Sequence, residues 1–178
     1  MKISVLLLLI VALPAAFYSQ TTAPAPALEM KKLDFLVGQW QGEGSIMVGR
    51  GERRMFHQTE TVQRKVEGTV LLIEGLGKGR IADKGEEVII HSAFAVVSFD
   101  KEAKVYRWRA FKADGTSLDA QAQVTDNLLI WSFHDARAGD IRFTIKLNEK
   151  GQWFEIGESS RDGKTWQKFL EMTLSRVS

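Results

Sequence analysis

Short turns recur through most of this chain, and the gaps between them leave no room for helical crossovers. Two-residue turn signals such as Asp114-Gly115 and Asp162-Gly163 recur at roughly the 8–12-residue spacing typical of β-barrels and sandwiches. The segments that fit strands are 53–66, 69–75, 88–99, 105–111, 117–124, 128–134, 141–147, 154–160 and 167–177. A further strand opens at Trp40, which gives about ten. Parallel strands need long crossovers, so short links predict an antiparallel meander.

Several of these strands alternate apolar and polar residues, which indicates one buried face. In 141–147, for example, Ile141, Phe143 and Ile145 alternate with polar side chains. A long meander has two exposed edges unless its first and last strands pair. We therefore predict an all-β fold: an up-and-down antiparallel barrel of about ten strands with a short N-terminal helix. A sandwich is the alternative.

The segment 32–46, KLDFLVGQWQGEGSI, predicts how the barrel begins. Leu33, Leu36 and Val37 form one apolar stripe at helical spacing. Gly38 follows where a helix commonly ends. Trp40 then opens the first strand, on the same face as the glycines at 42 and 44. Glycine there either lets the strand coil or leaves a cavity, and the sequence leaves both open.

The last strand carries a cation on its apolar side. Arg176 shares a face with Met172 and Leu174. We expect its guanidinium to pack over the indole of Trp40, a cation–π contact that closes the barrel. The alternative is a solvated Arg176 near a frayed terminus.

Three blocks of sequence, LDFLVGQWQGEG, AVVSFDKEAKVYRWRAFKADG and EIGESSRDGKTWQKFLEMTL, together resemble the bacterial domains of unknown function of the DUF1579 type. The resemblance spans 29–177 and implies a lipocalin-like (calycin) barrel, similar in layout to the nitrobindins. Nitrobindin-like proteins hold haem through a histidine on the final strand. Here no histidine follows His134, and Ser45-Ile46 stand where those proteins carry a tyrosine-proline pair. The resemblance thus implies the barrel without haem, and we expect no cofactor.

The N-terminus predicts export. Lys2 precedes an apolar run, 3–13, and small residues follow it, as in a secretory signal peptide. The run is too short to span a bilayer. Cleavage after Ala16, Ser19 or Ala27 fits equally well. Segment 20–27, rich in Pro, Ala and Thr, predicts a disordered spacer. We therefore expect a leader and spacer over 1–27, a barrel domain over 28–178, and a periplasmic or extracellular protein without a membrane span.

Composition and motifs exclude several classes of function. The net charge of +2 without a basic run gives no electrostatic footprint for nucleic acid. Cysteine is absent, and the three histidines lack the spacing of a metal site. No G-x-S-x-G elbow is present. The glycine-rich segment 75–80, GLGKGR, does not match a phosphate loop and predicts a link between strands.

Segment 105–111 offers the most specific ligand hypothesis. Arg107 and Arg109 share one face, and Trp108 lies on the other. If the arginines face inward, they need a carboxylate, either Glu158 or one from the ligand. The alternative is that they are solvated outside while Trp108 packs inward. We also place His91 and Trp131 among the ligand contacts.

These observations favour an exported barrel that binds a small hydrophobic or amphipathic molecule, including an anionic amphiphile. The alternative is a filled lumen, in a structural or partner-binding module. An enzyme is less favoured than either. The sequence leaves the ligand and the oligomeric state open.

Overall fold

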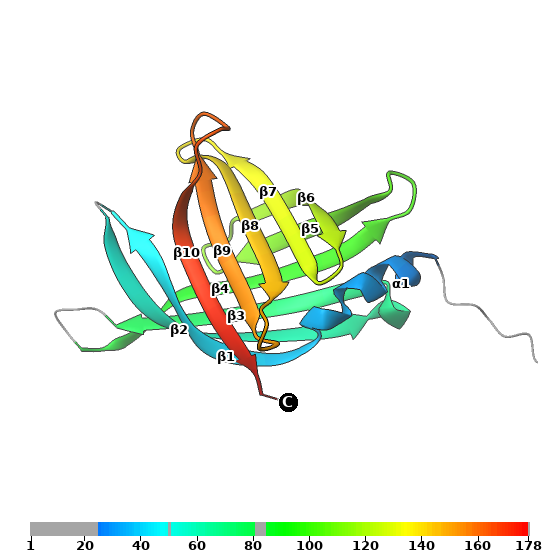
Figure 1. The fold of residues 1–178 in the computed structure, drawn as a ribbon, viewed down its shortest axis with the longest axis horizontal. Coiled ribbons are helices and arrows are strands. Elements are labelled where there is room, and N and C mark those ends of the chain that lie inside the picture. Colours follow the sequence, from blue (N-terminus) through cyan, green and yellow to red (C-terminus); the bar gives the residue numbers. More distant parts are fainter. Residues whose placement is uncertain (1–24, 50, 81–84, 178) are drawn as a thin grey trace, which may run out of the picture.

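A computed structural model describes residues 25–49, 51–80 and 85–177. A short helical segment, α1 (Ala25–Met30) with the 3-10 turn η1 (Lys31–Leu36), precedes ten strands (Figure 1). The strands are β1 (Gly38–Val48), β2 (Glu52–Lys65), β3 (Val70–Arg80), β4 (Glu87–Asp100), β5 (Val105–Lys112), β6 (Ser117–Thr125), β7 (Leu128–Asp135), β8 (Gly139–Leu147), β9 (Trp153–Ser160) and β10 (Gln167–Arg176). A single 3-10 turn, η2 (Val66–Gly68), links β2 to β3.

The strands form one closed sheet in sequence order. Each strand pairs antiparallel with the next, and β1 pairs with β10 to close the barrel. In that last ladder Trp40 lies opposite Arg176 and Gly42 opposite Leu174. The predicted all-β up-and-down barrel with a short N-terminal helix is confirmed.

Two boundaries differ from the sequence-based expectation. The segment 75–80 is not a link: it continues β3, with Gly75 opposite Glu60 and Gly77 opposite Gln58. α1 begins at Ala25, inside the spacer expected to lack structure, and Ala27 is buried. The rest of the predicted leader and spacer, 1–24, lies outside the described residues. No helix in the described part of the chain is both long and apolar enough to cross a membrane.

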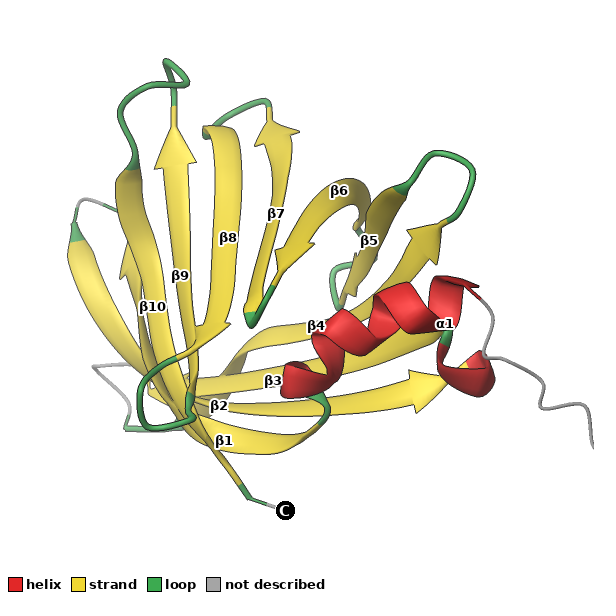
Figure 2. Cartoon of the chain, turned by 45° about the vertical axis from the view of Figure 1, so that its right-hand side comes forward, coloured by secondary structure: helices red, strands yellow, loops and turns green. Residues whose placement is uncertain are grey.

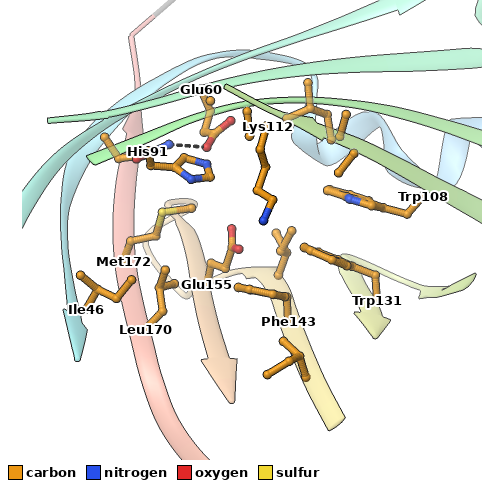
Figure 3. Close-up of a pocket in the computed structure, with 18 of the residues that line it drawn as sticks. Ile46, Glu60, His91, Trp108, Lys112, Trp131, Phe143, Glu155, Leu170 and Met172 are labelled. Carbon is orange, nitrogen blue, oxygen red and sulfur yellow. Dashed lines mark hydrogen bonds between the residues drawn. The ribbon is translucent and has the colours of Figure 1, made fainter. Parts of the chain in front are cut away.

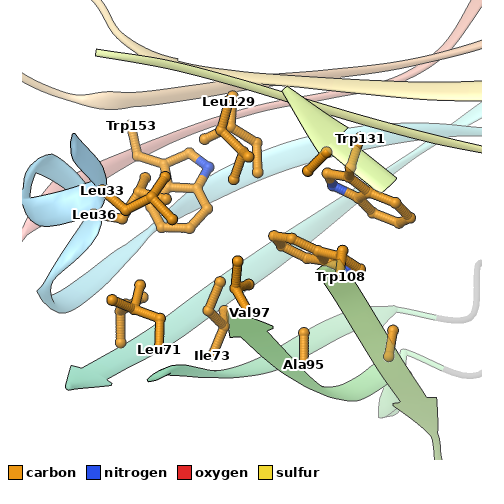
Figure 4. Close-up of a cluster of buried hydrophobic side chains, with 14 of the residues drawn as sticks. Leu33, Leu36, Leu71, Ile73, Ala95, Val97, Trp108, Leu129, Trp131 and Trp153 are labelled. Carbon is orange, nitrogen blue, oxygen red and sulfur yellow. The ribbon is translucent and has the colours of Figure 1, made fainter. Parts of the chain in front are cut away.

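The helical segment closes one end of the barrel (Figure 2). Met30, Leu33 and Leu36 are fully buried, and Figure 4 shows Leu33 and Leu36 beside Trp153. The rings of Trp153 and Trp40 meet edge to face, with centroids 5.8 Å apart, a favourable aromatic geometry. This end of the barrel is therefore packed.

The contact expected between the first and last strands is present. The Arg176 guanidinium carbon lies 4.1 Å from the centroid of a Trp40 ring. Its nitrogens donate to the backbone carbonyls of Phe35, at 3.0 Å, and of Val37. Arg176 therefore ties β10 to both the helical segment and β1. The Trp40 Nε1–H donates to the Leu36 carbonyl at 2.8 Å.

Gly42 allows β1 and β10 to approach closely. A Cβ at this position would lie 2.2 Å from the backbone oxygen of Thr173 and 2.9 Å from the Cα of Leu174. Real Cβ atoms do not tolerate such distances to backbone. The sequence left open whether this glycine lets the strand coil or leaves a cavity, and the structure shows a third role, the close approach of two strands.

Candidate ligand-binding cavity

The lumen is hollow above the packed end. It holds a cavity of about 430 Å³, within the 300–1,000 Å³ range typical of small-molecule sites. Aliphatic side chains from most strands share its wall, among them Ile46, Ile73, Ala93, Ala95, Ala110, Leu118, Ile141, Ile145, Leu170 and Met172. The wall also includes residues at the open end, such as Ile90, Lys112 and Ala138.

One side of the cavity is aromatic. Trp131 stacks on Trp108, with centroids 4.7 Å apart and planes within 7°, and on Phe143 at 4.4 Å. Both tryptophans are buried. Neither indole Nε1–H has a hydrogen-bond partner among the described residues. Trp131 thus lies between the other two rings, and the stack makes one side of the cavity rigid and apolar.

A small group of polar side chains also lines the cavity, and Figure 3 shows Glu60 and Glu155 facing it. Gln58 and Glu60 reach it from β2, and Glu155 from β9. These side chains are only 2%, 6% and 8% exposed. The Gln58 Nε2 donates to Glu60 Oε1 at 2.7 Å, and the Trp153 Nε1–H donates to Glu155 Oε2 at 3.0 Å. Each buried carboxyl is thus held by one donor.

Two glycines of β3 make room for this polar group. A Cβ at Gly75 would lie 2.7 and 2.9 Å from the two carboxyl oxygens of Glu60. A Cβ at Gly77 would lie 2.6 Å from Gln58 Oε1. The glycine-rich segment therefore lets these side chains lie flat against β3.

Burial controls the charge of the polar group. It raises the pKa of Glu155 to about 7, against the opposing effect of the Trp153 hydrogen bond. It raises the pKa of Glu60 well above its ordinary value, and the nearby Glu155 charge adds to this effect. His91 faces the same space, and burial followed by the charge of Lys112 lowers its pKa. At neutral pH the polar group carries less charge than its composition suggests.

Lys112 enters the cavity from the open end. The residue as a whole is exposed, but Figure 3 shows its ammonium group extending between the side of Glu60 and His91 and the side of Trp108. It lies on the same face of β5 as Trp108 and Ala110. A cation is therefore present in the lumen, on a side chain that can also reach solvent.

The structure places the predicted ligand residues on different sides of the barrel wall. Trp131 and His91 line the cavity. Arg107 and Arg109 do not line it: of the two orientations that the sequence left open, the structure shows the outward one. Arg109 lies 2.9 Å from Asp119 and Arg107 lies 3.5 Å from Asp100. Strand alternation puts the arginines outside because the bulky Trp108 between them packs inward.

Glu158, the carboxylate that inward arginines would have needed, does not line the cavity either. It accepts from Arg142 at 2.7 Å, and the same guanidinium lies over the Trp166 ring at 4.0 Å. The inward carboxylate of this strand is Glu155, which sequence analysis did not select. Its alternation with the inward Trp153 was the signal that pointed to it.

The histidines remain separate. The His134 Nδ1 lies 2.8 Å from Asp140 on the outer surface, and His57 pairs in register with Glu43. No group of three or more histidines, cysteines or carboxylates in the described residues could hold a metal ion. On β10 the residues facing the cavity are Leu170 and Met172. The last strand thus offers haem no imidazole.

Structural comparison finds the same architecture in a mycobacterial protein. The match is "Crystal Structure of Rv2717c from M. tuberculosis", with a TM-score of 0.58 and 14% sequence identity. It covers 86% of this chain and 99% of that chain. A structural match at this low sequence identity shows that the two proteins share a barrel fold. No family model matches the chain, and no curated protein matches it at a significant level.

Proposed function

We propose that this barrel binds one small apolar or amphipathic molecule in its lumen. The observation that carries the proposal is the hollow above the packed end. It combines an apolar and aromatic wall with a few convergent buried polar groups, the combination typical of small-molecule sites. The filled-lumen alternative has no comparable explanation for a cavity of about 430 Å³.

The two ends of the barrel have different roles in the proposed binding. Leu33, Leu36 and Trp40 block one end, so a ligand enters between the hairpins at the other. Its apolar body would lie against Trp108 and Trp131, where burial stabilises it by roughly 25 cal/mol per Å² removed from water. Its polar end would meet the buried side chains near Glu60.

The remaining sequence-based expectations are consistent with this role. The signal-like N-terminus supports an exported protein, acting in the periplasm or outside the cell, and the three sequence blocks support a DUF1579-type, lipocalin-like barrel. An anionic amphiphile would find Lys112 in the lumen, in place of the arginines that lie outside. Binding, rather than catalysis, is the function that the cavity supports best.

Filling the lumen tests the proposal. We expect 1-aminoanthracene, an uncharged fluorescent probe, to bind the wild-type protein at one site, and Ala110→Trp to weaken its binding at least about tenfold. Ala110 lines the cavity, so an indole there occupies the ligand's space. Arg109→Trp, one residue away on the outer face, is the matched control and should bind as the wild type does.

Both variants should show wild-type circular dichroism before they are compared. Loss of binding in Ala110→Trp alone supports a lumenal site. No probe binding to the wild type, or equal binding by both variants, contradicts it and favours the filled-lumen alternative.

A further inference from the structure

We propose that the polar end of the cavity receives a positively charged nitrogen group, an ammonium, amidinium or protonated heterocycle, carried by a flat apolar ligand. This inference rests on the proposed lumenal binding and specifies its chemistry. It starts from the two carboxyl groups of Glu60 and Glu155.

Both carboxyl groups are buried and incompletely bonded. Glu60 accepts at Oε1 and Glu155 at Oε2, while the second oxygen of each has no hydrogen-bond partner among the described residues. In the same part of the chain, no lysine, arginine or histidine lies within 4.0 Å of either carboxyl group. Figure 3 shows both carboxyls at the cavity. A buried carboxylate that accepts one hydrogen bond and has no cation beside it is costly to ionise, and a bound cation would offset that cost.

The site is shaped for these carboxyls. Gly75 clears the space that Glu60 occupies. Gln58 and Trp153 each use a buried donor to hold one carboxyl oxygen, which leaves the other free toward the cavity. Such preset hydrogen bonds fix the direction in which a ligand donor must approach.

The aromatic wall suits the same ligand class. Trp131 lies between Trp108 and Phe143, and all three stacked rings line the cavity. This stack gives a flat apolar body an apolar side of the cavity to pack against. A cationic head attached to an aromatic or other flat body can therefore contact the carboxyls and the wall together.

Lys112 decides between a cationic and an anionic ligand. Its ammonium lies in the lumen (Figure 3), where an anion could pair with it. However, Lys112 is exposed and can withdraw to solvent, whereas Glu60 on β2 and Glu155 on β9 are buried and cannot. A ligand cation can thus displace Lys112. A ligand anion that pairs with Lys112 would remain beside the two carboxyls, and their ionised forms would repel it.

The proposal has a defined pH signature. The ionisable groups that line the cavity are Glu60 from β2, His91 from β4, Lys112 from β5, Asp135 from β7 and Glu155 from β9. A bound cation favours ionised carboxyls, so binding at neutral pH should release protons. Affinity should rise from pH 6 to pH 8, the range in which Glu155 titrates, while an alkylammonium remains charged.

Three matched probes test the charge preference by calorimetry: tryptamine, uncharged tryptophol and anionic indole-3-acetate. We expect tryptamine to bind wild-type protein at least about tenfold more tightly than tryptophol, with proton release that depends on the buffer. Glu60→Gln and Glu155→Gln, which preserve side-chain shape, should each remove most of that preference. Lys112→Met should leave tryptamine affinity unchanged or increase it.

The control is Glu158→Gln, on the same strand as Glu155 but outside the barrel, and it should bind tryptamine as wild type does. Tightest binding of indole-3-acetate, lost in Lys112→Met, would overturn the inference in favour of an anion site. Equal binding of all three probes would overturn it too, while leaving lumenal binding intact. If the uncharged 1-aminoanthracene also fails to bind, the proposed function itself is contradicted.

Discussion

Glu155 shows how a single residue links the stability of this barrel to its cavity. Burial raises its pKa to about 7 from an ordinary value of 4.5. In the unfolded chain it ionises at lower pH, so between these values the folded protein binds more protons. Stability linked to this group is therefore greatest below pH 4.5 and falls as pH rises toward 7.

The first prediction follows from this linkage. Between pH 5 and pH 8, Glu155 should cost the wild-type protein up to about 3 kcal/mol of unfolding free energy, and Glu155→Gln should remove that loss. Urea unfolding at each pH measures it. The variant is needed for comparison because His91 also titrates differently in the folded protein. Its pKa is lowered, so its contribution to stability rises with pH while that of Glu155 falls. A difference between the two proteins that does not change with pH would contradict the prediction.

Trp40 gives a second prediction at this scale. It is 1% exposed, packs on Trp153 and lies under Arg176. Trp40→Ala should lower the free energy of unfolding by about 3–5 kcal/mol, the usual cost of emptying a core aromatic position. Trp166→Ala is the control, because Trp166 is only half-buried beneath Arg142, and it should cost clearly less. Equal losses in denaturant unfolding would count against Trp40 as the closing residue.

The sequence predicted which way a side chain faces only in strands that alternate apolar and polar residues and carry large apolar side chains on one face. His91 and Trp131 line the cavity, and their contact with a ligand stays a prediction. The orientation of Arg107 and Arg109 stayed open, since a strand with polar and aromatic residues on both faces does not show which face is buried. Glu155 was missed although it shares a strand face with Trp153, because carboxylates are rarely assigned to buried positions.

At the scale of elements, the seam between β1 and β10 is the point at which the barrel closes. Gly42 lies there with the Thr173 carbonyl 2.2 Å from where a Cβ would stand. The backbone cannot move aside for an added Cβ as a flexible side chain can. The seam therefore depends on a missing side chain as well as on the Trp40–Arg176 contact.

Gly42→Ala tests that dependence. We expect a loss of about 2–3 kcal/mol of unfolding free energy, as for other overpacked sites. Gly79→Ala in β3 is the matched control, since its Cβ would meet neighbours at 3.3–3.4 Å, and it should change stability by less than about 1 kcal/mol. Thermal or urea unfolding in which both variants behave alike would refute the seam argument.

The elements themselves were largely predictable from sequence. Turn spacing and alternation located ten strands, with most ends within two residues of those observed. The exceptions were α1, hidden in a Pro/Ala segment, and the second half of β3. Repeated glycines suggest a link, but in β3 they accommodate Gln58 and Glu60 across the ladder. A glycine that makes room for a side chain of the neighbouring strand cannot be recognised from the sequence of its own strand alone.

At the scale of the whole molecule, the barrel has one packed end and one hollow half. The helical segment and the Trp40–Trp153 pair fill the first. Stacked rings and the buried carboxyls line the second. This division predicts that substitutions at the packed end change stability, whereas substitutions such as Ala110→Trp change ligand binding.

Haem provides a negative prediction at the same scale. The last strand presents Leu170 and Met172 to the cavity, so an imidazole-ligated haem has no support there. Titration of purified protein with haemin should give no saturable Soret shift at one equivalent. A stoichiometric complex with such a shift would show that another residue, with His91 first to be tested, ligates iron.

Native mass spectrometry tests the central claim most directly. Wild-type protein and Ala110→Trp would each be equilibrated with a small-molecule extract of the protein's own source and desalted gently. We predict that wild type retains one small molecule per chain, released on denaturation, and that Ala110→Trp retains none. Wild-type protein that carries no adduct, or the same adducts on both proteins, would contradict a ligand-binding lumen.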